Sequence, residues 1–523
     1  SGIAGLFNLD GAPVDRAAFE RVVAAGIGRG PDAQGCWFDG PIALGHTMLR
    51  TTPEAREEKQ PLIDEQAGLG IVLDGRIDNR AELISALKAR GASLTFNTDA
   101  ELVLRAYELW GENAPSRLIG DFAFVIWDGP QRRLFCARDP VGIKPFCYWS
   151  DNRAFLCASE ICQLLQDARV PRQPNEAMIA EQLTGSLYSA DETLFQNIMR
   201  LPPGHQMVVR ADKIEIRRYF DPNNFPEVRY AGDDDYAARF LELFTEAVRC
   251  RMRASSGIGA DLSGGLDSSS ITCIAQRLLR GGMVNERQFE TFSLIYDEPE
   301  ADERAYIRDV VEHAHVPSNF VPGLVLDAAA CEAKVRGSLD LPEYPNGATA
   351  NSARSLMQQK RFRILLSGIG GDDWLWGDGP HYSRLIKDLR LAELVQRLRD
   401  DARLIRLDPT PTITLAKIVL KDGFWPLLPQ PAREAIKRGL RYRNYPEWLA
   451  PDLVRRTNLK ERLRIRSDTL LPGNYTRVME MEERKLAHRG IEGRYPFHDL
   501  RLIAFACGIP EEQRRSGDRH KYV

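Results

Sequence analysis

The segment ADLSGGLDSSSI, residues 260–271, constrains the fold of this chain more than any other stretch. The apolar run GIGADL that leads into it has the length of a short strand. After it, Ile271, Ile274 and Leu278 recur at helical spacing. Two glycines and several serines separate the two patterns. The sequence therefore predicts a strand, a glycine loop and the amino terminus of a helix in immediate succession.

This corner has the chemistry of an anion-binding loop. The first backbone N–H groups of a helix lack intrahelical partners and lie at the positive end of the helix dipole, so they attract an anion such as phosphate. Gly264 and Gly265 allow the backbone to approach that ligand closely. Ser263 and Ser268 add hydroxyl donors. The Asp267 carboxylate would repel a polyphosphate unless a cation lay between them, which makes Asp267 a candidate Mg²⁺ ligand.

The loop is not a Walker P-loop, because no Gly-Lys-Ser/Thr follows the glycines. The order S-G-G-x-D-S instead resembles the pyrophosphate loop of the ATP pyrophosphatases, which release pyrophosphate and adenylate a substrate. The resemblance implies ATP and Mg²⁺ as cofactors. It leaves asparagine synthetases, tRNA-modifying enzymes and several other ligases open.

Two further stretches supply chargeable residues for the same site. In LLSGIGGDD, residues 365–373, a second apolar strand runs into glycines and acids. Strand ends in an open parallel sheet converge on one crevice, so Asp372 is expected to join Asp267 around Mg²⁺. The segments IEGRYPFHD and DRHKYV add Glu492 and Lys521. Taken alone, each of these two is more often a surface charge than a catalyst.

Composition sets the broad class. A chain of 523 residues that is 43% hydrophobic and 27% charged can bury two sizeable cores. Its formal net charge of −3 gives no electrostatic footprint for nucleic acid. The 9 cysteines contain no C-x-x-C pair and favour reduced thiols over disulfides or a zinc site. No apolar run reaches the ~18 residues of a membrane span, and the opening residues show no signal pattern, so we expect a cytoplasmic protein without membrane or nucleic-acid partners.

The chain is expected to contain two domains. Pro, Asn, Gly and Asp cluster in residues 219–235, where hydrophobic periodicity stops, and we interpret this stretch as a linker. Over residues 1–218, strand patterns such as DFAFVIWD and RLFCARD alternate with helical ones such as DAELVLRAYELWG, which predicts sheets covered by helices. Over residues 236–523, strands and helices alternate, as in ETFSLIYD followed by DERAYIRDVVEHA, which predicts a parallel α/β sheet.

Together these segments resemble the asparagine synthetase superfamily. SGIAGLF, RGPDAQG, DGRIDN, GDFAFVIWD and RDPVGIKP are similar to its Ntn-type glutaminase domain. The resemblance implies an αββα sandwich over residues 1–218. Over residues 236–523 it implies a parallel-sheet α/β synthetase domain of the ATP-pyrophosphatase (adenine nucleotide alpha hydrolase-like) kind, with a helical region at about 380–470. It also implies that four residues line the nucleotide: Leu262, Ser293, Ser367 and Gly368.

The glutaminase-like half departs from the superfamily pattern at its functional positions. Ser1 stands where the superfamily has a cysteine nucleophile, although a serine could also act with its own α-amine as base. Thr47 and Met48 stand where an arginine would bind the glutamine carboxylate, and neither forms a bidentate contact. Asp74 replaces an oxyanion-stabilising asparagine, and Arg76 replaces the glutamate that meets the substrate amine. We therefore expect the fold to be kept and glutamine hydrolysis to be lost.

Without glutamine hydrolysis the amine must come from another source, although Asp99 keeps one of the expected contacts. Two branches of the superfamily, the β-lactam synthetases and the lasso peptide macrolactam cyclases, use an amine already on the substrate. Ile369 stands where the β-lactam branch has the tyrosine of a tyrosine–glutamate dyad, and a hydrophobic side chain takes no proton. ADERAYI, residues 301–307, and YPEWLAPDLVRR, residues 445–456, resemble the lasso cyclases.

The resemblance to lasso cyclases implies a two-step reaction. An Asp or Glu side chain of a precursor peptide is adenylated with release of pyrophosphate, and the peptide's amino-terminal amine then closes an isopeptide macrolactam. Lys521, which matches a lysine near the carboxyl end in the family, would stabilise charge on the α-phosphate and on the tetrahedral oxyanion. Glu492 would hold or deprotonate the amine. The implied partners are the precursor peptide and a leader-binding protein and leader peptidase of the same pathway.

Other functions stay open. An asparagine synthetase would adenylate aspartate and use glutamine or ammonia, and a β-lactam synthetase-like ligase is a second alternative. A tRNA-modifying enzyme is expected to show a basic patch and a cysteine pair, and neither is visible in the sequence. A non-catalytic scaffold would keep the fold without ATP-dependent release of pyrophosphate.

Residues 384–407, RLIKDLRLAELVQRLRDDARLIRL, predict an amphipathic helix with arginines on one face. Its other face carries four apolar residues: Ile386, Leu389, Val395 and Leu398. The helix is interpreted either as a packing element with a solvated basic face or as part of a surface that docks the peptide.

Overall fold

The computed structural model describes residues 1–185, 187–222, 224–284, 288–324, 328–341, 349–376, 381–404, 416–417, 419–429, 431–433, 436, 445–463, 473–516 and 519–523. The chain divides into two compact units. The first comprises Ser1–Asn224, Ala247–Gly368 and Leu449–Asp499, and the second comprises Phe225–Glu246, Ile369–Trp448 and Leu500–Val523. Among the described residues, no helix has both the length and the apolar character needed to cross a membrane.

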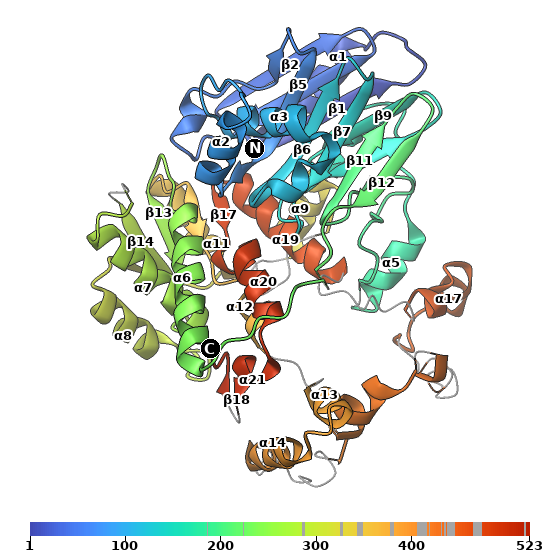
Figure 1. The fold of residues 1–523 in the computed structure, drawn as a ribbon. Helices are drawn as coiled ribbons and strands as arrows, with labels where there is room; N and C mark the ends of the chain where they lie inside the picture. The colour runs from blue at the N-terminus through green and yellow to red at the C-terminus, as the bar shows by residue number, and fades with distance from the viewer. Residues whose placement is uncertain are drawn as a thin grey trace. The chain divides into compact units, whose positions relative to one another are not determined.

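Two antiparallel six-stranded sheets form the amino-terminal part of the first unit (Figure 1). The strand orders are β10-β8-β9-β1-β3-β2 and β12-β11-β7-β6-β5-β4. The strands of the first sheet are β1 Gly2–Asn8, β2 Ala33–Asp39, β3 Ile42–Met48, β8 Cys147–Ser150, β9 Ala154–Ala158 and β10 Met199–Arg200. Those of the second are β4 Leu62–Asp64, β5 Leu69–Ile77, β6 Gly120–Asp128, β7 Arg133–Arg138, β11 His205–Val209 and β12 Ile214–Arg218.

Strand β6 shows why these sheets are layered. Its side chains alternate between two cores, as the two-residue period of a strand requires. Ala123 and Val125 are buried between the two sheets, together with Ile3 of β1. Phe122 and Phe124 are buried on the other side, in a core that also contains residues of α2 Arg80–Lys88 and α3 Asp99–Trp110.

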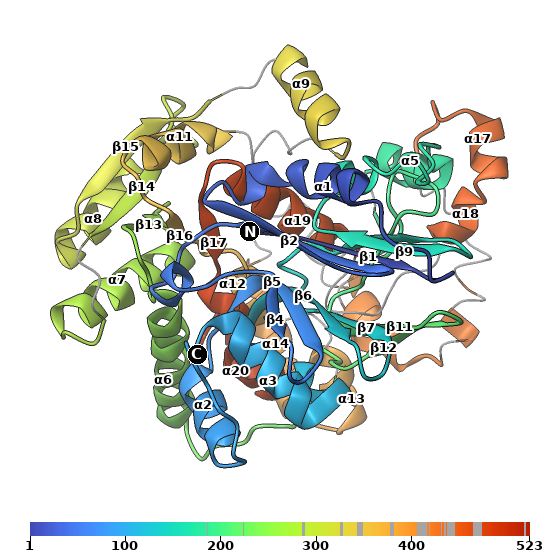
Figure 2. The same cartoon turned by 90° about the horizontal axis from the view of Figure 1, so that it is seen from above.

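Helix α1, Arg16–Ala24, and the short helix α4, Ile161–Leu164, contact strands of the first sheet. Figure 2 shows α1 on one side of the paired sheets and α3 on the other. The layers are therefore helix, sheet, sheet and helix, which confirms the predicted αββα sandwich.

A parallel five-stranded sheet with the order β15-β14-β13-β16-β17 forms the rest of the core of the first unit. Its strands are β13 Ile258–Asp261, β14 Phe289–Ile295, β15 Ser318–Pro322, β16 Ile364–Leu366 and β17 Glu492–Arg494. The remaining helices of this unit are α5 Glu176–Leu183, α7 Leu266–Arg280, α8 Arg304–Ala314, α9 Ala328–Ser338, α11 Asn351–Gln359, α17 Pro451–Arg456, α18 Leu459–Arg462 and α19 Gly473–Ala487. The predicted parallel α/β sheet is confirmed.

The second unit is mostly helical in its described residues. It contains α12 Gly371–Leu375, α13 His381–Lys387, α14 Leu391–Leu404, the π-helical turn Val419–Phe424, α20 Leu500–Gly508, α21 Glu511–Arg514 and the two-stranded β18 Arg515–Ser516 and β19 Arg519–His520. Helix α6, Asp233–Arg251, begins inside residues 219–235, the stretch interpreted as the linker. Residues 219–232 are the part of that stretch that lies before the helix.

The prediction of a single helix over residues 384–407 is wrong. Helix α13 ends at Lys387 and α14 begins at Leu391. Between them Leu389 has a left-handed backbone, with φ 56°, and its residue is 78% exposed. The apolar face drawn from a continuous helix is therefore interrupted, and residues 405–407 lie outside the described part of the chain.

Buried ion pairs hold α19 against the sandwich within the first unit. Glu480 of α19 accepts hydrogen bonds from Arg138 Nη2 at 2.9 Å and from Arg200 Nε at 2.7 Å. All three side chains are buried. Burial alone would raise the pKa of Glu480, but the two guanidinium groups outweigh it and hold the pKa below its ordinary value.

Replacing Glu480 by Gln is expected to lower the free energy of unfolding by about 3–5 kcal/mol, because two buried guanidinium groups lose their shared carboxylate. The midpoint of unfolding in denaturant measures this loss. Glu312→Gln on α8, where the side chain is exposed, is the matched control and should change stability by less than about 0.5 kcal/mol. Equal effects of the two substitutions would show that the Glu480 pairs do not stabilise the unit.

Candidate functional site

The predicted phosphate loop lies between β13 and α7. Helix α7 begins at Leu266, and among the described residues no side chain caps its first backbone N–H groups. The N-cap residue is Gly265, and the first turn of a helix is the positive end of the helix dipole, which attracts an anion. The position of this loop at the start of α7 therefore fits the polyphosphate of a nucleotide.

Serine side chains shape the loop. Ser263 N donates to Ser268 Oγ at 3.1 Å, and Ser268 Oγ donates to Gly265 O at 3.2 Å. Ser263 Oγ lies 3.2 Å from Ser268 Oγ. The Ser268 hydroxyl, predicted as a ligand donor, therefore closes the loop in this structure.

Glycines set two close approaches at the loop. Gly264 has φ 82°, a left-handed conformation that disfavours other residues, and a Cβ there would lie 2.6 Å from Tyr306 Cβ. A Cβ on Gly368 would lie 3.1 Å from Asp267 Cβ and 3.2 Å from Ser268 N. The structure thus places Gly368 beside the loop, and its contact with the nucleotide stays a prediction.

The other predicted nucleotide residues lie at the ends of neighbouring strands. The backbone N–H of Leu262 donates to Phe292 O of β14 at 3.3 Å, which places Leu262 beside Ser293. Ser367 N donates to Arg494 O at 3.1 Å. Ser293 is fully buried, and its Oγ has no hydrogen-bond partner among the described residues. Such a hydroxyl is uncommon in a folded protein and is a candidate donor to a ligand.

Lys521 and Asp372, both in the second unit, form an ion pair. Lys521 Nζ lies 2.8 Å from Asp372 Oδ1, and the side chains are 12% and 70% exposed. Asp267 belongs to the first unit, so the shared Mg²⁺ site of Asp267 and Asp372 stays a prediction. Among the described residues, no three His, Cys, Asp or Glu side chains cluster as metal ligands.

Glu492 does not have the environment of a base. Its Oε1 accepts from Arg76 Nη1 at 2.8 Å, its Oε2 accepts from Arg494 Nη2 at 2.9 Å, and the Thr51 hydroxyl also donates to Oε2. Burial would raise the pKa of Glu492, but Arg494 and Arg76 hold it well below its usual range. A carboxylate held in this way stays ionised, and both of its oxygens already accept hydrogen bonds. Its predicted role toward the amine stays a prediction, and in this structure the carboxylate joins three parts of the first unit.

Arg76 occupies the position where the resemblance puts the amine contact of glutamine. Its Nε donates to Asp78 at 2.7 Å and its Nη2 to Asp121 at 2.9 Å, in addition to the Glu492 bond. The residue is wholly buried. All three carboxylates are directed at Arg76, so its guanidinium is already satisfied without a substrate.

The neighbouring positions are also occupied. Thr47 Oγ1 donates to Gly26 O at 3.1 Å. Asp74 accepts from Arg29 Nη2 at 3.1 Å. Burial opposes ionisation of Asp74, yet nearby cations bring its pKa down to about 2, so the carboxylate stays charged where an oxyanion would form. Asp99 accepts from Arg253 Nη2 at 2.9 Å and is therefore not a free substrate contact.

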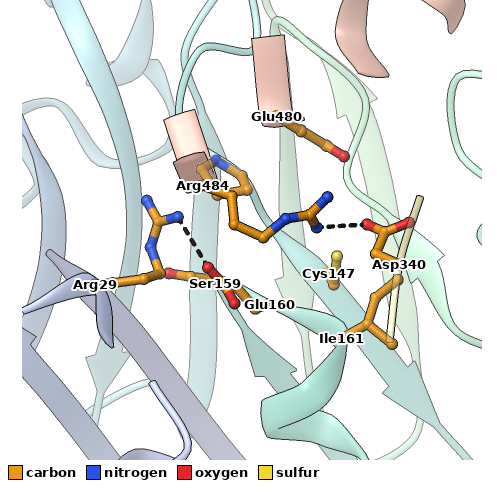
Figure 3. A pocket seen from close by; sticks show the side chains of 9 residues that line it. Arg29, Cys147, Ser159, Glu160, Ile161, Asp340, Glu480 and Arg484 are labelled. Carbon is orange, nitrogen blue, oxygen red and sulfur yellow. Dashed lines mark hydrogen bonds and ion pairs between the residues drawn. The ribbon is translucent and has the colours of Figure 1, made fainter. Parts of the chain in front are cut away.

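Figure 3 shows a small cavity beside this region, within the first unit. Arg29 pairs with Glu160 at 3.2 Å and Arg484 pairs with Asp340 at 2.9 Å across its lining. The other lining residues are Pro145, Cys147, Ser159, Ile161 and Glu480. The lining is strongly charged and internally paired, unlike the mostly apolar pocket that is usual for a small molecule.

Several of these buried partners were missed in the sequence. Lys144 lies in RDPVGIKP, a segment already singled out, but its Nζ donates to Glu483 at 2.6 Å, 339 residues away in the chain. No local pattern signals such a pair. The pair between Lys144 and Glu483 becomes visible only when the fold shows which charged residues are buried.

Comparison with known proteins identifies both parts of the chain. Residues 1–220 match the family model described as a glutamine amidotransferase domain, and residues 239–523 match the model described as asparagine synthase. Asparagine synthetase 3 of Bacillus subtilis is 29% identical over 95% of this chain and 78% of its own length. Amidase chry2 of Gibberella zeae is 28% identical over 67% of this chain. The chain spans 53% of the length of that amidase.

Among solved structures, the glutamine phosphoribosylpyrophosphate amidotransferase from B. subtilis, complexed with ADP and GMP, is similar over 75% of this chain and 79% of its own. The TM-score is 0.32 at 13% sequence identity.

Gly368→Ala is expected to raise the dissociation constant for MgATP about tenfold, because the added Cβ crowds Ser268 N and removes roughly one hydrogen bond to phosphate. Equilibrium binding to the full chain measures it. Gly337→Ala on α9 is the control, since nothing lies within 4 Å of its added Cβ. If Gly368→Ala binds MgATP as tightly as the control, Gly368 does not border the nucleotide.

Proposed function

This chain belongs to the asparagine synthase family, with a glutamine amidotransferase domain at its amino-terminal side, and from this premise we propose that it is a lasso peptide macrolactam cyclase. Family membership makes it an ATP-dependent carbon–nitrogen ligase. The proposal concerns the source of the amine and the identity of the acyl acceptor.

One observation carries the proposal: the position that should contact the glutamine amine holds Arg76, which is bound to three buried carboxylates. A glutamine could bind there only by displacing an ion cluster, and breaking a buried pair costs several kcal/mol. The amine must therefore come from outside this domain. An amine carried by the substrate itself, as in a peptide that closes onto its own side chain, meets that requirement.

In the proposed reaction, the side-chain carboxylate of an Asp or Glu in the precursor attacks the α-phosphorus of ATP, and pyrophosphate leaves. The loop between β13 and α7 would bind the pyrophosphate portion through the first N–H groups of α7. Mg²⁺, held with the help of Asp267 and Asp372, would neutralise the phosphate charge. The peptide's amine then attacks the activated carbonyl, AMP leaves, and Lys521 is proposed to stabilise the developing negative charge.

Asparagine synthetase is the second candidate, and the relatives named as asparagine synthetases favour it. In that case we expect free ammonia rather than glutamine to supply the nitrogen. The reason is again that Arg76 and its three carboxylates occupy the position where glutamine would bind. A β-lactam synthetase-like ligase is a weaker alternative, since Ile369 offers no proton acceptor.

Hydroxylamine trapping separates the first two candidates, because hydroxylamine converts an activated carboxyl group into a hydroxamate. With MgATP, we expect the full chain to form a hydroxamate from a synthetic peptide that has an amino-terminal glycine and a single internal Asp or Glu, and to form none from free aspartate. Without hydroxylamine, the same peptide should lose the mass of one water. Aspartyl hydroxamate from free aspartate, or asparagine from aspartate and ammonia, would contradict the cyclase assignment.

Lys521→Met provides the internal control for this assay. It should abolish the mass loss, whereas Lys460→Met, at an exposed position on α18, should leave it unchanged.

Glutamine is expected to yield no glutamate with the full chain above the rate in buffer. The reason is that Arg76 and Asp74 are both held in buried ion pairs at the positions that would contact the substrate. An enzyme-coupled glutamate assay with and without ATP measures the release. Glutamate production that disappears in Ser1→Ala would overturn this prediction.

A further inference from the structure

Asp261 is an unexpected residue at the entrance to the phosphate loop. It is the last residue of β13, and the loop serine Ser263 follows two positions later. A buried strand end normally takes an apolar residue. A free carboxylate so close to a polyphosphate site would repel the ligand, because like charges at short range inside a protein interact strongly.

Arg354 of α11 binds this carboxylate with both arms of its guanidinium. Nη1 donates to Asp261 Oδ1 at 2.6 Å, and Nη2 donates to Oδ2 at 2.8 Å. The Arg354 side chain is 4% exposed and that of Asp261 is 28% exposed. Paired, fork-to-fork contacts of this kind are among the strongest charge-assisted hydrogen bonds in proteins.

A glycine allows Arg354 to come this close. Gly259 and Asp261 lie on the same face of β13, because side chains alternate along a strand. A Cβ on Gly259 would lie 2.6 Å from Met357 Cε of α11. Met357 and Phe292 pack in one buried cluster with Ala353, so α11 rests directly on this face of the sheet. The close packing puts Arg354 at the carboxyl end of β13, level with the start of the loop.

We propose that Arg354 is a positioning residue for the phosphate loop, which cancels the charge of Asp261 so that the loop accepts the polyphosphate of ATP. The inference rests on the proposed ATP chemistry of this site. Arg354 acts through Asp261 and the loop backbone and does not itself contact the nucleotide.

Two single variants distinguish this electrostatic role from a purely structural one, in which the bonds between Arg354 and Asp261 would only hold the loop in place. Arg354→Met leaves a negative charge beside the loop, whereas Asp261→Asn leaves a positive one. Arg354→Met removes both bonds and Asp261→Asn keeps an oxygen acceptor for only one, so both should lower the thermal midpoint. Only an electrostatic role makes their effects on MgATP binding differ in direction.

The experiment measures equilibrium binding of MgATP to the full chain at low and high salt. We expect Arg354→Met to raise the dissociation constant about tenfold at low salt, with a smaller effect at high salt. Asp261→Asn should bind MgATP as tightly as the unsubstituted chain or more tightly. The double variant Asp261→Leu with Arg354→Met removes both charges and should restore binding to within about twofold, a ΔΔG of roughly 0.4 kcal/mol.

Equal weakening by Arg354→Met and Asp261→Asn would overturn the proposal. If Arg354→Met does not fold, Arg354→Lys decides instead: it keeps the charge but loses the fork, and it should bind MgATP nearly normally while being less stable. Weak binding by Arg354→Lys together with normal binding by the double variant would also overturn it. Failure of the unsubstituted chain to bind MgATP at all would instead refute the proposed function, and the inference with it.

Discussion

A wholly buried guanidinium needs carboxylates around it, and Arg76 imposes this requirement on the first unit. Its bond to Glu492 joins residues 416 positions apart in the chain. Glu492 begins β17, which pairs with β16 in register Ile364 to Glu492. Strand β16 leads into Gly368, which touches the start of α7. The ion cluster of the sandwich is therefore connected, through two adjacent strands, to the loop where the nucleotide is expected.

Under the proposal that the glutaminase-like sandwich does not hydrolyse glutamine, this connection gives the sandwich a structural role. Positions that would recognise a small substrate carry charges that pair with each other and with α19, as Lys144 does with Glu483 and Arg138 with Glu480. Removing any one partner would leave an uncompensated buried charge, which costs more than the pair contributes. Such a cluster therefore stabilises the fold of the domain whether or not a substrate binds there.

The sequence was sufficient for features that depend on local order. The strand, loop and helix around Gly264 follow from periodicity and glycine chemistry, and β6 alternates between two cores as its pattern requires. The break at Leu389 was missed, because an apolar period continues across a turn that only backbone dihedrals reveal. The partners of Glu492 could not be predicted either, since Arg76 comes from another part of the chain. The local sequence shows which residue occupies a position, but it does not show which charged side chains the fold brings close to that residue.

Asp261 is a second residue whose partner could not be predicted from the local sequence. In the sequence it contradicts the apolar pattern of a buried strand, and in the structure Arg354 explains it. Residues that break a local rule are expected where function or a specific partner compensates for the break.

The pair between Lys521 and Asp372 has a different character from these buried clusters. Asp372 is 70% exposed, so the pair is a surface ion pair that contributes only about 0–1 kcal/mol. Mg²⁺ or phosphate would compete with this pair at little energetic cost. The buried pairs around Arg76 and Arg354 are the opposite case, since breaking them strands a charge away from water. Burial therefore separates the pairs around Arg76 and Arg354, which hold the fold, from the more exposed pair between Lys521 and Asp372.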